Sequence, residues 1–174
     1  MKNNKNPYGP LSKEDALYQN TYALLKNYRE ITWSIKASTV SLKEEINHEF
    51  FMSMDEYLNS LYGAGVTKFD IKLENHAKQV ETSKQLLSLL MSSIEFIREN
   101  HEYGEEYYYI LYYTFLYKTK LSLEQILSSL AKEGYACGYR TYYRKRNEAI
   151  ETLSVVLWGA TMRSLKLPSE QEKE

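Results

Sequence analysis

The distribution of proline is the feature of this sequence that most restricts its fold. Two of the three prolines, Pro7 and Pro10, lie near the start of the chain, and Pro168 lies near its end. Proline breaks helices because it lacks an amide hydrogen and its ring clashes with the preceding turn. No proline lies between Pro10 and Pro168, and the whole chain has only 7 glycines. Long helices are therefore permitted throughout, and the sequence predicts an all-α fold.

Apolar side chains recur at helical spacing along most of the chain. Hydroxyl or acidic residues precede several of these segments and glycines follow two of them, as is typical of helix starts and ends. The predicted helical segments are 12–36, 41–63, 69–100, 105–117, 122–134 and 138–157. The first three predict an N-terminal helical bundle or hairpin.

Several classes of function are excluded by what the sequence lacks. The start of the chain has no apolar core of a signal peptide, and no apolar run approaches the ~20 residues that span a membrane. We expect a cytoplasmic protein without a membrane partner. The histidines His48, His76 and His101 have no metal-ligand spacing, and Cys137 is the single cysteine. The sequence therefore predicts no enzyme, no catalytic residue, no metal and no cofactor.

Tyrosines are concentrated in the segment 105–117, which reads EEYYYILYYTFLY. Exposed aromatic rings can stack on the bases of single-stranded nucleic acid. The apolar residues Ile110, Leu111 and Leu116 are interleaved with the tyrosines, and this favours a helix that packs its rings in a core. The predicted apolar face consists of Tyr108, Leu111, Tyr112 and Phe115.

The next two helices have the features of a helix-turn-helix motif. Ser122 and Gln125 have the spacing of a capping box, and Gly134 is typical of a helix end. The second helix, 138–157, has four cations and one acid among residues 138–150, a local charge of +3 that leaves −4 for the rest of the chain. Such an asymmetry predicts a partner that contacts one face of the molecule.

The position of these charges predicts that the partner is double-stranded DNA. A recognition helix enters the major groove by its N-terminal turns, while its C-terminal half anchors it to the domain. Arginine can hold guanine through two hydrogen bonds, and lysine neutralises phosphate. The predicted DNA contacts are Tyr139, Arg140, Thr141, Tyr143, Arg144, Lys145 and Arg146. The same helix is expected to bury Tyr142 and Leu153 on its inner side.

These two helices also carry a family resemblance. The run LSLEQILSSL followed by YRTYYRKRNEAIETL resembles region four of bacterial sigma factors. The chain is more similar to the ArpU-like transcriptional regulators of Gram-positive phages and mobile elements, with the phrases YYxILYYT and RTYYRxRxxAI and a closing LWG at 157–159. The resemblance covers about residues 102–159. It implies a DNA-binding regulator of transcription without catalytic activity, with RNA polymerase as a further candidate partner.

Two features depart from the sigma pattern. The connection between the two helices is several residues longer than the tight turn of sigma region four, and Gly138 replaces the usual serine cap. A helical bundle with a solvated basic face is the structural alternative. The functional alternative is a phage assembly or packaging adaptor such as a terminase small subunit-like protein. Cys137 is either a thiol of lowered pKa beside cations or a buried turn residue, and the second interpretation is favoured.

The predicted organisation of the chain follows from these features. Residues 1–11 and 163–174 are disordered polar tails, residues 12–100 form a helical bundle or oligomerisation region, and residues 101–162 form the helix-turn-helix domain. A single reading helix buries a modest interface, so a homodimer joined through 12–36 or 71–100 is expected. A DNA-binding protein of this kind would associate with the nucleoid.

Overall fold

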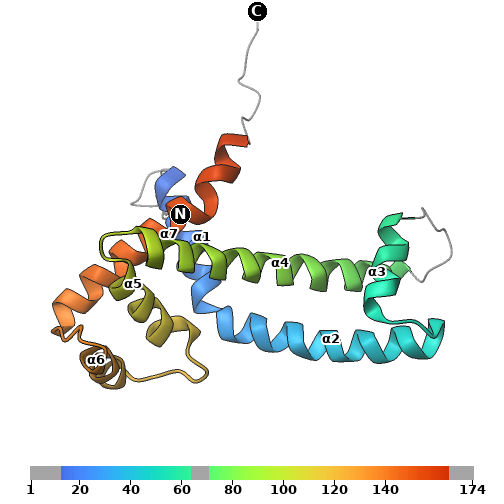
Figure 1. Cartoon of the computed structure of the whole chain (residues 1–174), viewed down its shortest axis with the longest axis horizontal. Coiled ribbons are helices and arrows are strands. Elements are labelled where there is room, and N and C mark those ends of the chain that lie inside the picture. Colours follow the sequence, from blue (N-terminus) through green and yellow to red (C-terminus); the bar gives the residue numbers. More distant parts are fainter. Residues whose placement is uncertain (1–12, 64–70, 165–174) are drawn as a thin grey trace, which may run out of the picture. The chain divides into compact units, whose positions relative to one another are not determined.

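The computed structural model describes residues 13–63 and 71–164, and these residues are helical almost throughout (Figure 1). The elements are α1 (Lys13–Lys26), α2 (Tyr28–Phe50), α3 (Met54–Gly63), α4 (Ile71–Asn100), α5 (Gly104–Leu111), the π-helical turn η1 (Tyr112–Leu116), α6 (Leu123–Lys132) and α7 (Tyr139–Ser164). The part of the chain that the structure describes contains no strand. The predicted all-α fold is confirmed.

The chain divides into two compact units. One, which we call the α7 unit, comprises the residues up to Tyr28 and those from Ser92 onward, and the other, the α2–α3 unit, comprises Arg29–Met91. This division differs from the predicted one, in which residues 12–100 formed a single region. The physical reason is that α1 packs against α7, far away in the sequence. Helical periodicity shows that α1 has an apolar face but not which helix covers that face.

The α2–α3 unit has one apolar core, shared by α2, α3 and the first turns of α4. The buried side chains of this core are Leu42, Ile46, Met54, Tyr57, Leu73, Ala77 and Val80. In Figure 1, α3 lies across the end of α2 and the start of α4. The predicted helix 69–100 corresponds to α4, which is described from Ile71 onward.

The breaks between the first helices differ from the predicted ones. The predicted helix 12–36 is interrupted at Asn27, which is in a turn between α1 and α2. The predicted helix 41–63 is interrupted at Phe51, whose φ of 54° is rare for a residue with a side chain. Ser53 then starts α3, because its Oγ accepts a hydrogen bond of 3.2 Å from the amide of the third helical residue. Neither break contains glycine or proline, so the sequence pattern did not predict it.

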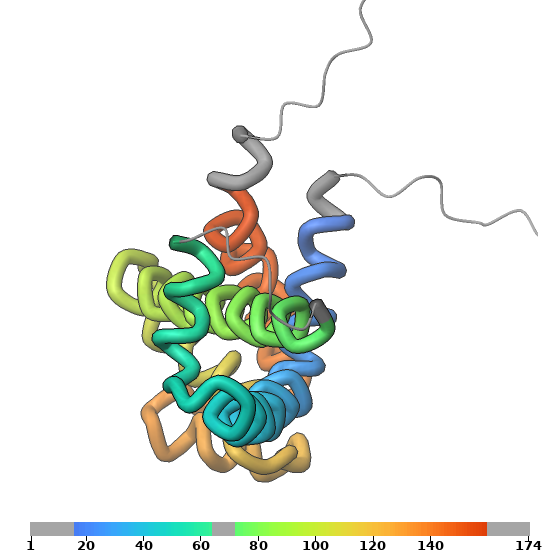
Figure 2. The backbone as a smooth tube through the Cα atoms, turned by 90° about the vertical axis from the view of Figure 1, so that its right-hand side faces the viewer, coloured from blue at the N-terminus to red at the C-terminus, as the bar shows by residue number. Residues whose placement is uncertain are grey.

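Within the α7 unit, α1 and α7 lie side by side, as Figure 2 shows. The indole Nε1 of Trp158 donates a hydrogen bond of 2.8 Å to Thr21 Oγ1, and Thr21 is fully buried. The Tyr18 hydroxyl donates one of 3.3 Å to Asn147 Oδ1. These contacts hold the middle and the C-terminal half of α7 in place.

A tight turn joins α4 to α5 at Gly104. A Cβ atom at this position would collide with the backbone carbonyl oxygens of Ile97 and Arg98. The Gly104 amide donates a hydrogen bond of 2.9 Å to the carbonyl of His101. The end of α4 and the start of α5 can therefore approach this closely only because residue 104 lacks a side chain.

The π-helical turn η1 follows α5 directly. The Tyr117 amide donates a hydrogen bond of 2.8 Å to the Tyr112 carbonyl, five residues back, which is the π-helical pattern. The buried hydrophobic side chains of α5 and η1 are Tyr107, Ile110, Leu111 and Phe115. Of the predicted apolar face, Leu111 and Phe115 are buried, whereas Tyr108 and Tyr112 are half-buried and stack on each other.

Both predicted ends of α6 are confirmed. Ser122 and Gln125 form a reciprocal capping box, with hydrogen bonds of 2.8 and 3.3 Å. Gly134 has a φ of 89°. The amides of Gly134 and Tyr135 return to the carbonyls of Ala131 and Leu130, at 3.2 and 2.8 Å, and so satisfy the last turn of the helix.

Some predictions fall partly or wholly outside the described residues. The tail predicted at 1–11 lies outside them, and so does the tail predicted at 163–174 except for residues 163 and 164, which extend α7. Among the described helices, none combines the length and the apolar character that crossing a bilayer requires.

Candidate nucleic-acid interface

The helix α7 starts where the connection from α6 ends. The carbonyl of Gly138 accepts a hydrogen bond of 3.0 Å from the Tyr142 amide and so opens the first helical turn. The helix runs from Tyr139 to Ser164, whereas the sequence predicts 138–157. All seven predicted DNA contacts lie in its first two turns.

The inner face of these turns fixes α7 to the rest of the α7 unit. Tyr142 is 2% exposed and packs in one core with Ile126 and Leu130 of α6. Its hydroxyl lies 2.9 Å from Thr114 Oγ1, and burial raises the pKa of Tyr142. The buried apolar side chains further along α7 are Ala149, Ile150, Leu153 and Leu157. The predicted burial of Tyr142 and Leu153 is confirmed.

Four predicted contacts form the outer face of the same turns. Tyr139 is 54% exposed and Tyr143 is 43% exposed. Arg140 is exposed, and so is Arg144, whose side chain is 62% accessible. Each arginine is four residues from the other, and so is each tyrosine, so the four side chains form two adjacent rows on the helix. We call Tyr139, Arg140, Tyr143 and Arg144 the outer face of α7.

Lys145 points away from this outer face and toward α5. Its Nζ pairs with both carboxylate oxygens of Glu106. The Glu106 side chain is only 10% exposed, and that of Lys145 is 23% exposed. The pair joins α7 to α5 and neutralises one of the four cations. The predicted contact of Lys145 with phosphate therefore competes with an ion pair inside the protein.

Arg146 and Thr141 are half-buried. The Arg146 guanidinium lies 5.0 Å from the centre of the Tyr143 ring, and its Nη2 donates a hydrogen bond of 3.1 Å to Asn147 Oδ1. Its Nε is buried without a hydrogen-bond partner among the described residues. Arg146 thus supports the Tyr143 ring from the side and is less accessible to a partner than Arg140 or Arg144.

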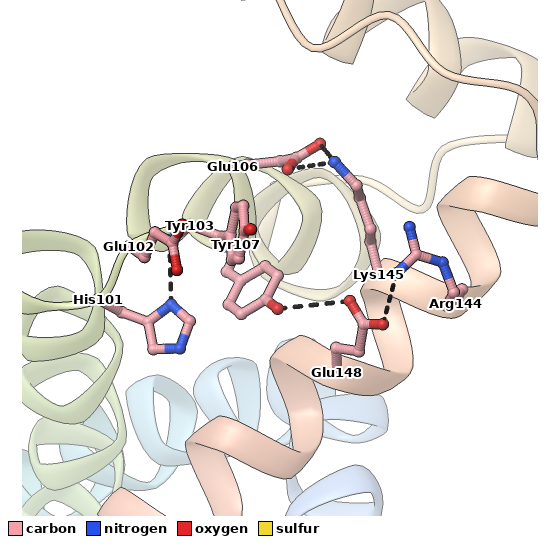
Figure 3. Close-up of a pocket in the computed structure, with 8 residues that line it drawn as sticks. All are labelled: His101, Glu102, Tyr103, Glu106, Tyr107, Arg144, Lys145 and Glu148. Carbon is pink, nitrogen blue, oxygen red and sulfur yellow. Dashed lines mark hydrogen bonds and ion pairs between the residues drawn. The ribbon is translucent and has the colours of Figure 1, made fainter.

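A cavity of about 590 Å³ lies between α5 and the start of α7 (Figure 3). Its lining consists of His101, Glu102, Tyr103, Glu106, Tyr107, Arg144, Lys145 and Glu148. Arg144 Nη1 donates a hydrogen bond of 2.7 Å to Glu148 Oε1. The Tyr107 hydroxyl donates a longer one, 3.4 Å, to Glu148 Oε2. Both cations that line the cavity are therefore paired with carboxylates of the protein itself.

The tyrosine side of this cavity is packed against neighbouring side chains. Tyr107 is 5% exposed, and its ring centre lies 5.1 Å from that of His101. The Nδ1 of His101 accepts a hydrogen bond of 3.1 Å from the Tyr103 amide. Burial, and after it the charge of Glu148, raises the pKa of Tyr107. The hydroxyl therefore stays protonated near neutral pH and can keep donating to Glu148.

Cys137 lies half-buried in the connection between α6 and α7, against the core that contains Tyr142. Burial raises the pKa of its thiol, Glu106 raises it further, and Lys145 lowers it. A raised pKa reduces the thiolate fraction that reacts with oxidants. The interpretation as an activated thiol is contradicted, and the favoured one, a turn residue packed in the core, fits its position.

Three functional candidates were missed by sequence reasoning. Glu148 lies four residues after Arg144, a spacing that indicates a helical ion pair and could have predicted the contact. Glu106 and Tyr107 meet α7 through long-range packing, and no local pattern indicates this.

The comparisons with known proteins give no family for this chain. No protein-family model matches it, and no curated protein or solved structure matches it either. Within the described residues, no group of three or more histidine, cysteine or acidic side chains could hold a metal ion. The function must therefore be inferred from the geometry of α7 and its surroundings.

Proposed function

We propose that this protein is a sequence-specific DNA-binding regulator of transcription that reads the major groove with the first two turns of α7. The observation that carries the proposal is the outer face of α7, where two arginines and two tyrosines are exposed together at a helix N-terminus. The ArpU-like resemblance of residues 102–159 supports the same function and suggests that the regulated genes belong to a phage or mobile element.

The surroundings of α7 support this use of the helix. A reading helix has to be held rigidly while its first turns stay accessible. Tyr142 is buried in the core with α6, and the Glu106–Lys145 pair fastens the same turns to α5. Arg140 and Arg144 remain exposed on these turns, and their planar guanidinium groups can match the O6 and N7 atoms of guanine.

The distribution of charge suggests that phosphate contacts contribute little to this binding. Lys145 is occupied by Glu106, and Arg144 is paired with Glu148 in the free protein. Each phosphate that a protein neutralises contributes about 0.9 to the slope of log affinity against log salt concentration. We therefore expect a shallow salt dependence and a larger role for base contacts and for the tyrosine rings.

The same pairing favours a second candidate function, that of a protein-interaction adaptor in phage assembly or packaging. Tyrosine and arginine are among the residues most enriched in the energetic centres of protein interfaces. An outer face on which Arg144 is already paired with Glu148 also suits a protein partner. On this alternative, the outer face of α7 would bind protein and show no preference for any DNA sequence.

Selection from a pool of randomised duplex DNA tests the proposal. The full chain would be used to enrich binding sequences, and its affinity for the enriched and for random duplex would then be measured by fluorescence anisotropy over a range of salt concentrations. The proposal predicts a recurring sequence that binds at least about a thousandfold more tightly than random duplex. An enriched pool with no shared sequence would favour the adaptor.

A further inference from the structure

Glu148 is an acidic residue placed beside a proposed base-reading arginine. Its Oε1 accepts the 2.7 Å hydrogen bond from Arg144 Nη1, and its Oε2 accepts the 3.4 Å hydrogen bond from the Tyr107 hydroxyl (Figure 3). Arg144 and Glu148 belong to α7, whereas Tyr107 belongs to α5. The carboxylate is therefore held between two helices, and the arginine is held by the carboxylate.

This arrangement differs from an ordinary surface ion pair. A pair four residues apart on a helix usually contributes little, because both side chains are mobile and solvated. Here the Glu148 side chain is 37% exposed, and it has a second partner in Tyr107, which is buried. The Tyr107 ring is itself covered by His101. Glu148 is thus anchored, through Tyr107, to the packed interior of the α7 unit.

The contact leaves most of the guanidinium available. Arginine has five N–H donors in a planar fork, and the hydrogen bond to Glu148 uses Nη1 alone. The Arg144 side chain remains 62% exposed. A guanidinium held at one corner loses less conformational entropy when its other donors meet a base edge. Its orientation is also restricted before binding.

A carboxylate at this position has a second effect. If α7 enters the major groove, Glu148 comes close to DNA phosphates on every sequence, matched or not. Like charges repel, so the carboxylate weakens binding to all DNA. A site that lets Arg144 form its full set of base contacts offsets this repulsion, and other sites do not. Such an arrangement increases the difference between matched and unmatched DNA.

We propose that Glu148 is a positioning residue that determines specificity, in that it orients Arg144 toward one base pair, with Tyr107 as its support. The proposal rests on the proposed function, because it assigns a role within the same DNA-reading face. The proposal assigns this role to Glu148 and not to the neighbouring acid Glu151, which is exposed on the same helix one turn away.

The test compares four variants of the full chain, Glu148→Gln, Tyr107→Phe, Arg144→Ala and the double variant Arg144→Ala/Glu148→Gln. Affinities would be measured for the DNA selected by the parent protein, for its single-base-pair variants and for random duplex, with folding checked by circular dichroism. Glu151→Gln is the matched control, since it removes the same charge from the same helix.

For Glu148→Gln we expect tighter binding to random duplex and a selected-to-random affinity ratio about five- to tenfold lower, concentrated at the base pair that Arg144 reads. Tyr107→Phe should show a smaller loss of the ratio. The double variant should discriminate no worse than Arg144→Ala alone, because Glu148 acts through Arg144. Glu151→Gln should leave the ratio unchanged.

Three results would overturn the inference. If Glu148→Gln and Glu151→Gln behave alike, the effect is one of net charge. If the preference changes at a base pair that Arg144→Ala does not affect, Glu148 contacts a base itself. If the parent selects a sequence and Glu148→Gln keeps the full ratio, the carboxylate has no role in reading. A parent that selects no sequence would instead refute the proposed function, and the inference with it.

Discussion

At Gly104 a single missing side chain decides how two helices meet. A Cβ atom there would collide with the carbonyl oxygens of Ile97 and Arg98, which are backbone atoms and cannot rotate away. We predict that Gly104→Ala lowers the free energy of unfolding by about 1–3 kcal/mol, through displacement of α5 from the end of α4. Urea melts followed by circular dichroism would measure this loss.

Gly138 provides the matched control for that substitution. It precedes α7, has no positive φ, and a Cβ atom placed on it meets no atom within 4 Å. Serine is at least as favourable as glycine at a helix start, so Gly138→Ser should change stability by only a few tenths of a kcal/mol. If both variants lose the same free energy of unfolding, the close contact between α4 and α5 at Gly104 does not restrict the side chain there.

Tyr113 makes stability depend on pH in the alkaline range. Its hydroxyl donates a hydrogen bond of 2.7 Å to Glu133, and this contact, with burial, raises the pKa of Tyr113 to about 12. In the unfolded chain the pKa is about 10. The neutral form is therefore favoured by folding, and its contribution is complete below about pH 10 and is lost as the pH rises toward about 12.

The variant Tyr113→Phe should consequently lose less stability than the parent between these pH values. Urea melts at about pH 8 and about pH 11 would show the difference. Tyr139→Phe is the control, because Tyr139 is 54% exposed. If Tyr113→Phe and the parent lose stability equally over this range, Tyr113 does not contribute to the alkaline transition.

At the scale of the element, the Glu106–Lys145 pair joins α5 to α7. Removing one partner leaves the other charge poorly solvated, because neither side chain is well exposed. We predict that Lys145→Ala lowers the free energy of unfolding by about 1–3 kcal/mol and leaves the salt dependence of DNA binding unchanged. Melts and a salt series on the same variant measure the two quantities.

A double-mutant cycle separates the interaction energy between Glu106 and Lys145 from the contribution that each residue makes by itself. Lys145→Met combined with Glu106→Gln should cost less stability than the sum of the two single changes, because each single change leaves a charge without its partner. If Lys145→Ala instead flattens the salt dependence of DNA binding and leaves stability unchanged, Lys145 contacts phosphate and the pair with Glu106 does not stabilise the fold.

Element ends were predictable where their signals are local. The capping box at Ser122 and the stop at Gly134 depend on residues three or four positions apart, and both are confirmed. The interruptions at Asn27 and Phe51 have no such signal, so the apolar spacing predicts a continuous helix through each of them. The shift of the buried face from Tyr108 to Tyr107 depends on what covers α5, which periodicity alone does not show.

At the scale of the whole molecule, the division into two units could not be predicted from the sequence. Residues 13–26 belong to the unit that contains α7, although a long stretch of chain separates them. The candidate site was predicted in part. The charge pattern predicted an exposed face at the start of α7, and Tyr139, Arg140, Tyr143 and Arg144 are exposed there. The ion pair of Lys145 could not be predicted, because its partner Glu106 belongs to α5 and no local pattern links the two residues.

The proposed function requires that the exposed arginines of α7 read DNA. Its most direct test is the affinity of Arg140→Ala and Arg144→Ala for the selected duplex and for random duplex across a salt series, with folding verified by circular dichroism. Lys43→Ala, which removes an exposed cation from α2, is the control. We predict that each arginine variant loses about 1–3 kcal/mol for the selected site and accepts more sequences. Folded arginine variants that bind both duplexes as tightly as the parent and the control would contradict the proposed function.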